Sequence, residues 1–216
     1  MKSILIIGLG RFGSHLCAKL SRLDNEIMIV DQQEARLQEL LPYVVSAKIG
    51  DCTNEKVLKS LGVGNFDLCF VCIGNNFQSS LEITSQLKEL GAKYVVSKAN
   101  RDIHAKFLLR NGADEVIYPD RDIAYKVAVR FSANQVFDYV ELGKGFSIYE
   151  IAPLPEWIGR SILDVNVRVT YNTNIIGVKN EDGMKLMPGP DYVFEPDEHL
   201  MVIGHQNDIE KIVKKL

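Results

Sequence analysis

The sequence predicts an α/β chain: a doubly wound parallel Rossmann sheet followed by a second, smaller α+β domain. Over roughly the first 120 residues, short apolar, β-branched runs alternate with stretches of helical length, and a Gly-x-Gly-x-x-Gly motif joins the first run to the first stretch. Strands that are apolar throughout and alternate with helices form parallel sheets covered on both faces. Beyond about residue 136 the pattern changes to short strands separated by Gly, Pro and Asn-Asp turns.

The Rossmann elements follow from this alternation. Gly91 and Gly112 each follow a helical stretch, where a left-handed cap is easily adopted. The last helical stretch carries Ile123, Val127 and Phe131 at i, i+4 spacing, a stripe that suits either the core or a partner subunit. We predict strands at 4–7, 27–30, 44–49, 68–73, 94–97 and 115–117, and helices at 11–23, 32–41, 54–61, 76–90, 101–111 and 121–134.

Charge also divides the chain. Residues 1–134 hold 17 basic and 15 acidic side chains, a balance of +2. The remaining 82 residues hold 8 basic and 13 acidic side chains, a balance of −5, and they also contain five of the seven prolines. We therefore predict two domains, 1–134 and 135–216. In the second we expect strands at 138–142, 147–151, 175–179, 184–187 and 199–203, and a terminal helix at 208–216.

Composition excludes several classes of protein. A net charge of −3 gives no sign of a nucleic-acid partner. No apolar run approaches the roughly 18 residues of a membrane span, and no signal peptide is evident, so we expect a cytosolic chain. Cys69 and Cys72 form a C-x-x-C inside an apolar run, where cysteine acts as a small hydrophobe, and no second pair completes a zinc site.

The glycine motif, Gly8 to Gly13, predicts a dinucleotide or nucleotide site, because it follows a strand and opens a helix. Gly8 makes the tight turn, Gly10 lets phosphates approach the backbone, and Gly13 allows close helix packing. The helix N-terminus offers free N–H groups to those phosphates. Asp31, at the end of the second strand, can accept from ribose hydroxyls and repel a 2′-phosphate, which disfavours NADP. Its other interpretation is a cap for the helix from Gln32 onward.

Polar side chains follow the next two strands. Asp51, in Gly50-Asp51-Cys52-Thr53, can accept from an adenine amino group or belong to a helix cap with Asn54. Gly74-Asn75-Asn76 can donate to phosphate or sugar oxygens or cap the next helix. Arg11 either pairs with a polyphosphate or is an exposed helix arginine.

The same glycine loop also suits a small NAD-dependent oxidoreductase. Hydride transfer needs a general acid or base and a substrate-binding group from a second domain. None of the four histidines falls at a strand end in the first domain, and the second domain offers no nucleophile-base pair. Binding without chemistry is therefore the preferred interpretation, and the oxidoreductase is the alternative.

With these motifs assembled, the chain resembles cytosolic potassium-transport regulators of the TrkA/KtrA type, built from an RCK N-domain and an RCK C-domain. The resemblance implies a regulatory subunit that binds ATP, ADP or NAD(H) and gates a membrane-embedded potassium channel or transporter subunit. It further implies a homodimer, formed through the N-domain and its following helix, that assembles into an octameric ring at the inner face of the membrane. It rests on residues 6–13, 30–31, 50–53, 73–76, 98–99, 112–119, 166–168 and 174–176.

By motif, the resemblance assigns phosphates to the glycines and Arg11, ribose to Asp31, the adenine side to Asp51 and the cleft floor to Lys98. The full expected set is Gly8, Gly10, Arg11, Phe12, Gly13, Asp31, Gln32, Asp51, Cys52, Thr53, Gly74, Asn75, Asn76 and Lys98.

Two further ligands follow from the resemblance. A divalent cation, Ca²⁺ or Mg²⁺, is implied near the phosphates at Asp120, where better-known members carry Glu. Some members bind cyclic di-AMP on the C-domain, for which the matching residues here are Asn166–Arg168, Asn174–Ile176 and Pro188. The acidic balance of this part of the chain disfavours that ligand.

Overall fold

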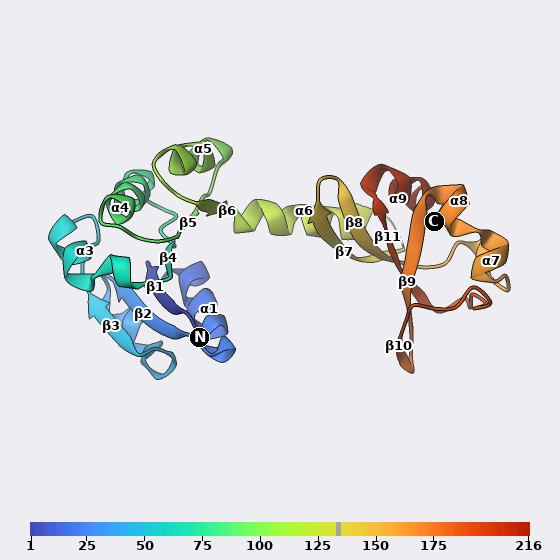
Figure 1. Cartoon of the computed structure of the whole chain (residues 1–216), viewed down its shortest axis with the longest axis horizontal. Helices are drawn as coiled ribbons and strands as arrows, with labels where there is room; N and C mark the ends of the chain where they lie inside the picture. Colours follow the sequence, from blue (N-terminus) through green and yellow to red (C-terminus); the bar gives the residue numbers. More distant parts are fainter. Residues whose placement is uncertain (133–134) are drawn as a thin grey trace. The chain divides into compact units, whose positions relative to one another are not determined.

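Six parallel strands form one sheet and five antiparallel strands form another in the computed structural model, which describes residues 1–132 and 135–216 (Figure 1). The chain divides into two units, Met1–Asp120 and Arg121–Leu216. Helix α6 (Pro119–Ser132) crosses this division, and within the second unit its Val129 packs on the core and its Tyr125 ring meets Tyr139. The predicted boundary after residue 134 lies outside the described residues.

The first sheet has the order β3-β2-β1-β4-β5-β6, and every neighbouring pair is parallel. The order reverses between β1 and β4, so the predicted doubly wound fold is confirmed. Its strands are β1 (Ser3–Ile7), β2 (Glu26–Asp31), β3 (Ser46–Ile49), β4 (Leu68–Val71), β5 (Val95–Lys98) and β6 (Glu115–Ile117).

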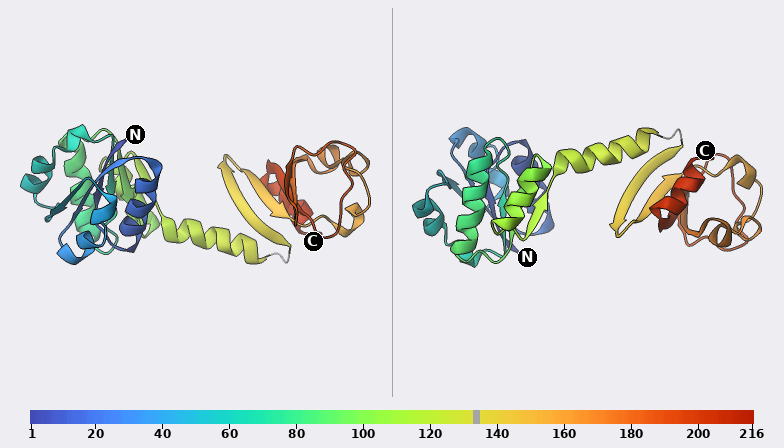
Figure 2. Two further views of the ribbon diagram at one scale, coloured as in Figure 1. Left: turned by 90° about the horizontal axis from the view of Figure 1, so that it is seen from below. Right: turned by 90° about the horizontal axis from the view of Figure 1, so that it is seen from above.

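Helices cover both faces of this sheet (Figure 2). They are α1 (Arg11–Leu20), α2 (Glu34–Gln38), α3 (Glu55–Leu61), α4 (Phe77–Glu89) and α5 (Asp102–Arg110), with short 3₁₀ turns at Ser21–Leu23, Leu41–Tyr43 and Val63–Asn65. Helix α2 is shorter than predicted at both ends, and Pro42, which cannot continue an α-helix, lies in the 3₁₀ turn that follows it. Among the described residues, no helix is both long and apolar enough to span a membrane.

Strand β1 explains why the apolar pattern is continuous rather than alternating. Ile6 packs on one face of the sheet with Cys17 of α1, and Leu5 packs on the other with Leu58 of α3 and Ile83 of α4. Successive strand residues point to opposite faces. Both faces are buried, so both sets of side chains must be apolar.

The second unit is built on an antiparallel sheet in the order β10-β9-β11-β8-β7. All five predicted strands and the terminal helix are present, whereas two short helices were not predicted because four or five residues show no helical periodicity. The elements are β7 (Val136–Gly143), β8 (Phe146–Ile151), α7 (Ile162–Val165), α8 (Val167–Tyr171), β9 (Thr173–Asn180), β10 (Gly183–Leu186), β11 (His199–His205) and α9 (Gln206–Val213).

A buried carboxylate, Glu150 on β8, joins strands of this sheet. Its Oε1 accepts a hydrogen bond from Lys179 Nζ at 2.9 Å and lies 2.7 Å from Nδ1 of His199, whose ring stacks on Phe137. An ionised carboxylate only accepts hydrogen bonds, so Nδ1 carries the proton. Burial raises the pKa of Glu150, but the hydrogen bonds from Lys179 and His199 outweigh burial and hold the pKa below 4.5.

We expect Glu150→Gln to lower the free energy of unfolding at pH 7 by about 1.5–3 kcal/mol, the usual worth of a hydrogen bond to a charged group. Because the pKa of Glu150 is lower in the folded protein than in the unfolded chain, where it is about 4.3, the ionised carboxylate stabilises the fold fully at pH values above the unfolded pKa. This stabilisation is lost as the pH falls through the folded-state pKa. Urea unfolding followed by Trp157 fluorescence should therefore show the stabilities of the two proteins converging as pH falls through the lowered pKa of Glu150. The exposed Glu141→Gln is the control, and a gap that stays constant with pH would contradict the assignment.

Candidate functional site

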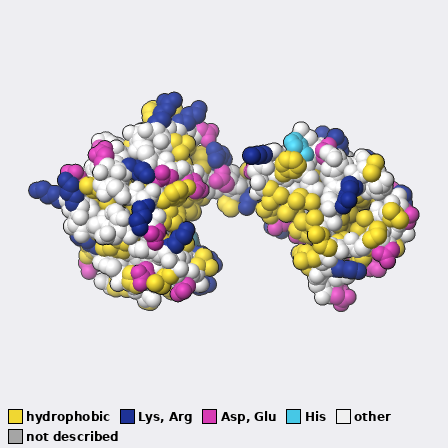
Figure 3. Space-filling view, viewed as in Figure 1, with side chains coloured by type: hydrophobic (Ala, Val, Ile, Leu, Met, Phe, Trp, Pro, Cys, Tyr) yellow, Lys and Arg dark blue, Asp and Glu magenta, His cyan; other side chains and the backbone are white. Residues whose placement is uncertain are grey.

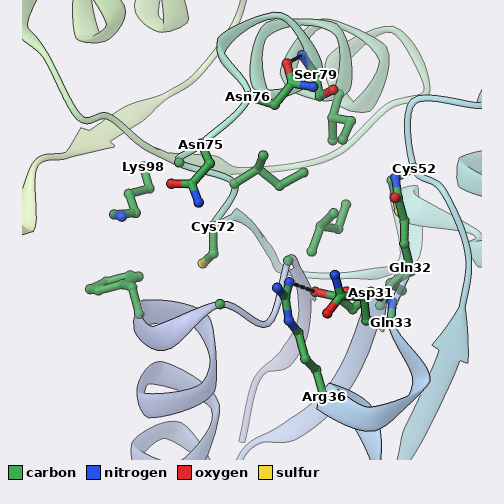
Figure 4. Close-up of a pocket in the computed structure, with 18 of the residues that line it drawn as sticks. Asp31, Gln32, Gln33, Arg36, Cys52, Cys72, Asn75, Asn76, Ser79 and Lys98 are labelled. Carbon is green, nitrogen blue, oxygen red and sulfur yellow. Dashed lines mark hydrogen bonds and ion pairs between the residues drawn. The ribbon is translucent and has the colours of Figure 1, made fainter.

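A cleft of about 330 Å³ opens at the carboxyl ends of the parallel strands (Figure 4). It lies beside β1 and β4, where the strand order reverses, the place at which doubly wound sheets bind ligands. Its walls come from the carboxyl ends of β1, β2 and β5 and from the segments that follow β1, β2, β3 and β4. The lining residues are Ile7, Gly8, Gly10, Arg11, Phe12, Val30, Asp31, Gln32, Gln33, Arg36, Gly50, Cys52, Thr53, Cys72, Ile73, Gly74, Asn75, Asn76, Ser79, Ile83 and Lys98.

The three motif glycines have different structural roles. Gly8 has φ of +90°, in the left-handed region, and a Cβ on Gly13 would lie 2.1 Å from the Gly8 carbonyl oxygen. Gly13 therefore brings α1 against the loop and does not line the cleft. Gly10 has ordinary extended backbone, and a Cβ there would meet no atom within 4 Å. Gly10 keeps open space directly in front of the α1 N-terminus.

The carboxylate of Asp31 is buried at the end of β2 and fixes the glycine loop. Its Oδ2 accepts from the Leu9 N–H at 2.7 Å, and its Oδ1 accepts from the Gln33 N–H at 2.9 Å. The N-cap of α2 is Gln33, so Asp31 does not occupy the N-cap position. A carboxylate offers about four acceptor directions, so capacity for a ligand hydroxyl is left at the cleft.

Arg36, on α2, was not predicted as a site residue. Its guanidinium NH1 lies 3.4 Å from Asp31 Oδ2, and the side chain reaches toward the centre of the cleft in Figure 4. Gln33 and Ser79 are further polar lining residues that the motifs do not indicate. The sequence signal for Arg36 is its place in the first turn of the helix that follows Asp31.

Asp51 stays outside the cleft lining, although its neighbours Gly50, Cys52 and Thr53 line it. Its Oδ1 accepts from the backbone N–H and the hydroxyl of Thr53, and the hydroxyl bond leads in lowering the pKa of Asp51. The helix cap is Asn54, whose side chain accepts from the Lys56 N–H. The structure thus gives the capping role to Asn54 and leaves Asp51 exposed at the rim.

The two asparagines after β4 differ. Asn76 caps α4, because its Oδ1 accepts from the Ser79 N–H at 3.0 Å. Asn75 makes no such cap, and its side chain projects into the cleft in Figure 4. Asn76 therefore has the capping role, and Asn75 is the one whose side chain is left for a ligand. Both residues line the cleft.

Charge distinguishes this cleft. Arg11, Arg36 and Lys98 are the cations among the described lining residues, and Asp31 is the one carboxylate. Within the described part of the chain neither Arg11 nor Lys98 forms an ion pair, and Lys98 Nζ lies 6.0 Å from the ring centroid of Phe12. The lining thus carries a net charge of about +2, and a helix N-terminus adds to it. The cleft suits an anion that also has hydroxyl groups.

The thiols of the cleft are not nucleophiles at neutral pH. Burial raises the pKa of Cys72 to about 12, and burial with the nearby Asp51 and Asp31 carboxylates raises the pKa of Cys52 to about 12. Cys17 and Cys69 are also buried and unpaired.

Asp120, the expected metal ligand, is exposed in the first turn of α6 and does not line the cleft. Within the described residues, no group of three metal-ligating side chains comes together.

A second hollow, of about 300 Å³, lies in the second unit between α7, α8 and β9. It brings together the residues expected for a cyclic dinucleotide, apart from Ile176, which does not line it. Arg168 is the one cation among the described lining residues, and its NH2 donates to Asn174 Oδ1 at 3.3 Å. The lining is Ile162, Leu163, Asn166, Val167, Arg168, Asn174, Ile175, Pro188 and Pro190.

Family models match nearly the whole chain: the TrkA-N domain over residues 4–119 and the TrkA-C domain over residues 146–216. The chain belongs to the TrkA/Ktr family of potassium uptake proteins. It is 38% identical to Ktr system potassium uptake protein C of Bacillus subtilis (strain 168) over 215 residues, which are 100% of this chain and 97% of the relative. It is 35% identical to Ktr system potassium uptake protein A of the same organism over 210 residues, 97% of this chain and 95% of the relative.

Solved RCK structures share the fold of this TrkA/Ktr-family chain. The GsuK RCK domain superimposes with a TM-score of 0.71 at 17% identity, covering 99% of this chain and 47% of that one, so our chain spans about half of it. The GsuK channel bound to NAD superimposes with a TM-score of 0.55 at 21% identity, covering 100% of this chain and 38% of that chain. GsuK bound to ADP superimposes with a TM-score of 0.53 at 17% identity, covering 62% of this chain and 36% of that chain. The resemblance to the TrkA/KtrA type is confirmed.

Proposed function

We propose that this chain is the cytoplasmic regulatory subunit of a Ktr/Trk-type potassium transporter and that an adenine nucleotide in the first-unit cleft controls it. The observation that carries the proposal is the cleft lining of three cations and one buried carboxylate in front of a helix N-terminus. Phosphates suit the cations and the free N–H groups, and ribose hydroxyls suit Asp31. Family membership and the NAD-bound and ADP-bound GsuK structures, which share the fold, support this assignment.

The ligand class is ATP, ADP or NAD(H). Asp31 can accept from the ribose of each, whereas a 2′-phosphate would face its carboxylate, which disfavours NADP. Arg11, at the first position of α1, favours a polyphosphate. Of the predicted contacts, Gly8, Gly10, Phe12, Gln32, Cys52, Thr53, Gly74, Asn75, Asn76 and Lys98 all line the same cleft and belong to this proposal.

Assembly and the membrane partner are the second part of the proposal. On α6, Ile123, Val127 and Phe131 are 59%, 48% and 75% exposed, so the stripe is not core within this chain. Hydrophobic side chains also gather on the face of the second unit seen in Figure 3. These surfaces support a homodimer that builds the octameric ring and meets a membrane-embedded potassium subunit at the inner face of the membrane.

The last part of the proposal concerns a divalent cation at Asp120 and cyclic di-AMP in the second hollow. Asp120 alone supplies too few ligands for Ca²⁺ or Mg²⁺, so a cation there would need nucleotide phosphates or a partner copy. Arg168 alone supplies little charge for cyclic di-AMP, so we expect weaker binding in the second hollow than in the cleft.

Calorimetric titration of the full chain with ATP, ADP, NAD, NADH and NADP, with and without Mg²⁺ or Ca²⁺, tests the proposal. We expect an adenine nucleotide to bind and NADP to bind more weakly than NAD. A ligand at about 100 times its Kd should stabilise the fold by roughly 2.7 kcal/mol and raise the Tm. Light scattering of the same samples gives the assembly mass. Absence of both heat and Tm shift for all five would overturn nucleotide binding.

The oxidoreductase alternative is tested on the same samples. We expect NADH absorbance to stay constant with a panel of carbonyl and hydroxy-acid substrates, because the described lining residues include no histidine and the two thiols among them stay protonated. Substrate-dependent oxidation of NADH would favour the enzyme instead.

A further inference from the structure

Asn100 joins the ends of three neighbouring strands. It lies in the segment after β5, the strand between β4 and β6. Its side-chain Nδ2 donates to the carbonyl oxygen of Gly74, in the loop after β4, and its own carbonyl oxygen accepts from the hydroxyl of Tyr118, directly after β6. One residue therefore links the wall of the cleft to the last residue before α6.

Two polar side-chain ends lie close to Gly74, so a larger residue there would have to displace them. A Cβ on Gly74 would lie 2.8 Å from Asn100 Nδ2 and 3.0 Å from Lys98 Nζ. The amide and the ammonium group therefore crowd the same side of Gly74. Lys98 is also a cation of the cleft, so a bound anion would draw its Nζ away from this crowded point.

The amide of Asn100 is only half satisfied. Its Oδ1 is buried and has no hydrogen-bond partner among the described residues. Buried polar groups are nearly always paired, so this unpaired acceptor calls for an explanation. An amide with one strong contact and one open acceptor can change partners when its surroundings shift.

The far end of the link is the start of α6. Tyr118 is followed by Pro119, the first residue of the helix, and the Ala99 N–H donates to the Ile117 carbonyl at 2.8 Å. The backbone at 117 and the hydroxyl at 118 are thus both tied to the segment that carries Asn100. A displacement of this segment would be passed to the first turn of the helix.

We propose that Asn100 is a positioning residue that couples occupancy of the cleft to the first turn of α6. This inference rests on the proposed nucleotide function. A bound anion attracts Lys98 and Asn75, which displaces the Gly74 loop against the side-chain amide of Asn100. The displacement of Asn100 then reaches Tyr118, because the Tyr118 hydroxyl donates to the Asn100 carbonyl. Asn100 itself does not line the cleft, so it is not needed for binding.

Hydrogen exchange of the full chain, measured by mass spectrometry with and without saturating ADP and, in parallel, NADH, tests the coupling. In the wild type we expect exchange in the peptide 116–122 to change about fivefold or more on binding, the lower end of typical coupling. In Asn100→Ala and in Tyr118→Phe this change should be lost, while the Kd stays close to the wild-type value. Tyr118→Phe keeps the ring and removes only the hydroxyl, so it guards against misfolding of the first variant.

The matched control is Asn111→Ala, which removes an exposed amide that donates to the Phe107 carbonyl in the same unit. It should keep both binding and the exchange response. Nucleotide binding with variant responses equal to the wild type would overturn the coupling alone. If the wild type binds neither ADP nor NADH, the exchange is measured with ATP and NAD, and absence of binding to all four would overturn the proposed function, and the coupling with it.

Discussion

Gly13→Ala should strongly destabilise the first unit, whereas Gly10→Ala should leave it folded and weaken the proposed nucleotide binding. A Cβ at Gly13 would lie 2.1 Å from the backbone oxygen of Gly8, an atom that cannot swing aside. Overpacking costs about 1–3 kcal/mol and occasionally more, and a fixed backbone atom places this contact toward the upper end. The Tm from circular dichroism should fall sharply for Gly13→Ala and remain at the wild-type value for Gly10→Ala.

Gly10→Ala tests the ligand side of the same loop. Its backbone is ordinary and its Cβ would meet no protein atom within 4 Å, so the methyl group would occupy only cleft space. If phosphates approach the backbone there, calorimetry should show a Kd raised at least about tenfold, or about 1.4 kcal/mol. Gly64→Ala, which makes only ordinary contacts of 3.5 Å or more, is the control. Unchanged nucleotide affinity in Gly10→Ala would count against phosphates at this loop.

Asp31→Ala should cost both stability and affinity. The Leu9 and Gln33 N–H groups lose their acceptor, and the buried Leu9 donor, left unpaired, costs about 1–3 kcal/mol. A ribose loses a charge-assisted hydrogen bond worth about 1.5–3 kcal/mol, or roughly a 10- to 150-fold rise in Kd. Urea unfolding and calorimetry measure the two losses separately.

Glu26→Ala is the matched control for Asp31→Ala. Glu26 is an exposed acidic residue at the opposite end of β2, so it changes the same charge on the same strand without touching the cleft. Stability and Kd should both stay near wild type. If Asp31→Ala lost stability and kept its nucleotide affinity, the carboxylate would be a structural residue and the ribose assignment would be wrong.

The first sheet could be predicted from the sequence because its physics is local. Strands buried on both faces must be apolar, and turns such as Gly8 need a left-handed backbone, so residue type reveals the position. Twelve of the fourteen expected cofactor residues line one cleft for the same reason: they follow strands whose carboxyl ends meet at one edge. Gly13 and Asp51 lie just outside the lining, one packed on Gly8 and the other turned to Thr53.

The residues that were missed depend on tertiary geometry. Arg36 lies 3.4 Å from Asp31 in a helix that begins at Glu34, two residues later than the sequence indicated. Asn100 and Tyr118 meet because β5 lies between β4 and β6, and no spacing along the chain encodes that contact. Helices α7 and α8 are stabilised by a capping box at Ser161 and by packing rather than by a periodic pattern.

The dual bonding of Asp31 has a thermodynamic consequence for fragments of the ligand. The same carboxylate that would receive a sugar hydroxyl already holds the Leu9 N–H, and Leu9 is part of the loop that would receive phosphate. Groups that share a partner do not contribute independently. Adenosine and pyrophosphate, measured one at a time, should therefore give binding free energies that do not sum to that of the intact nucleotide, and the difference would measure how far sugar and phosphate recognition act as one site.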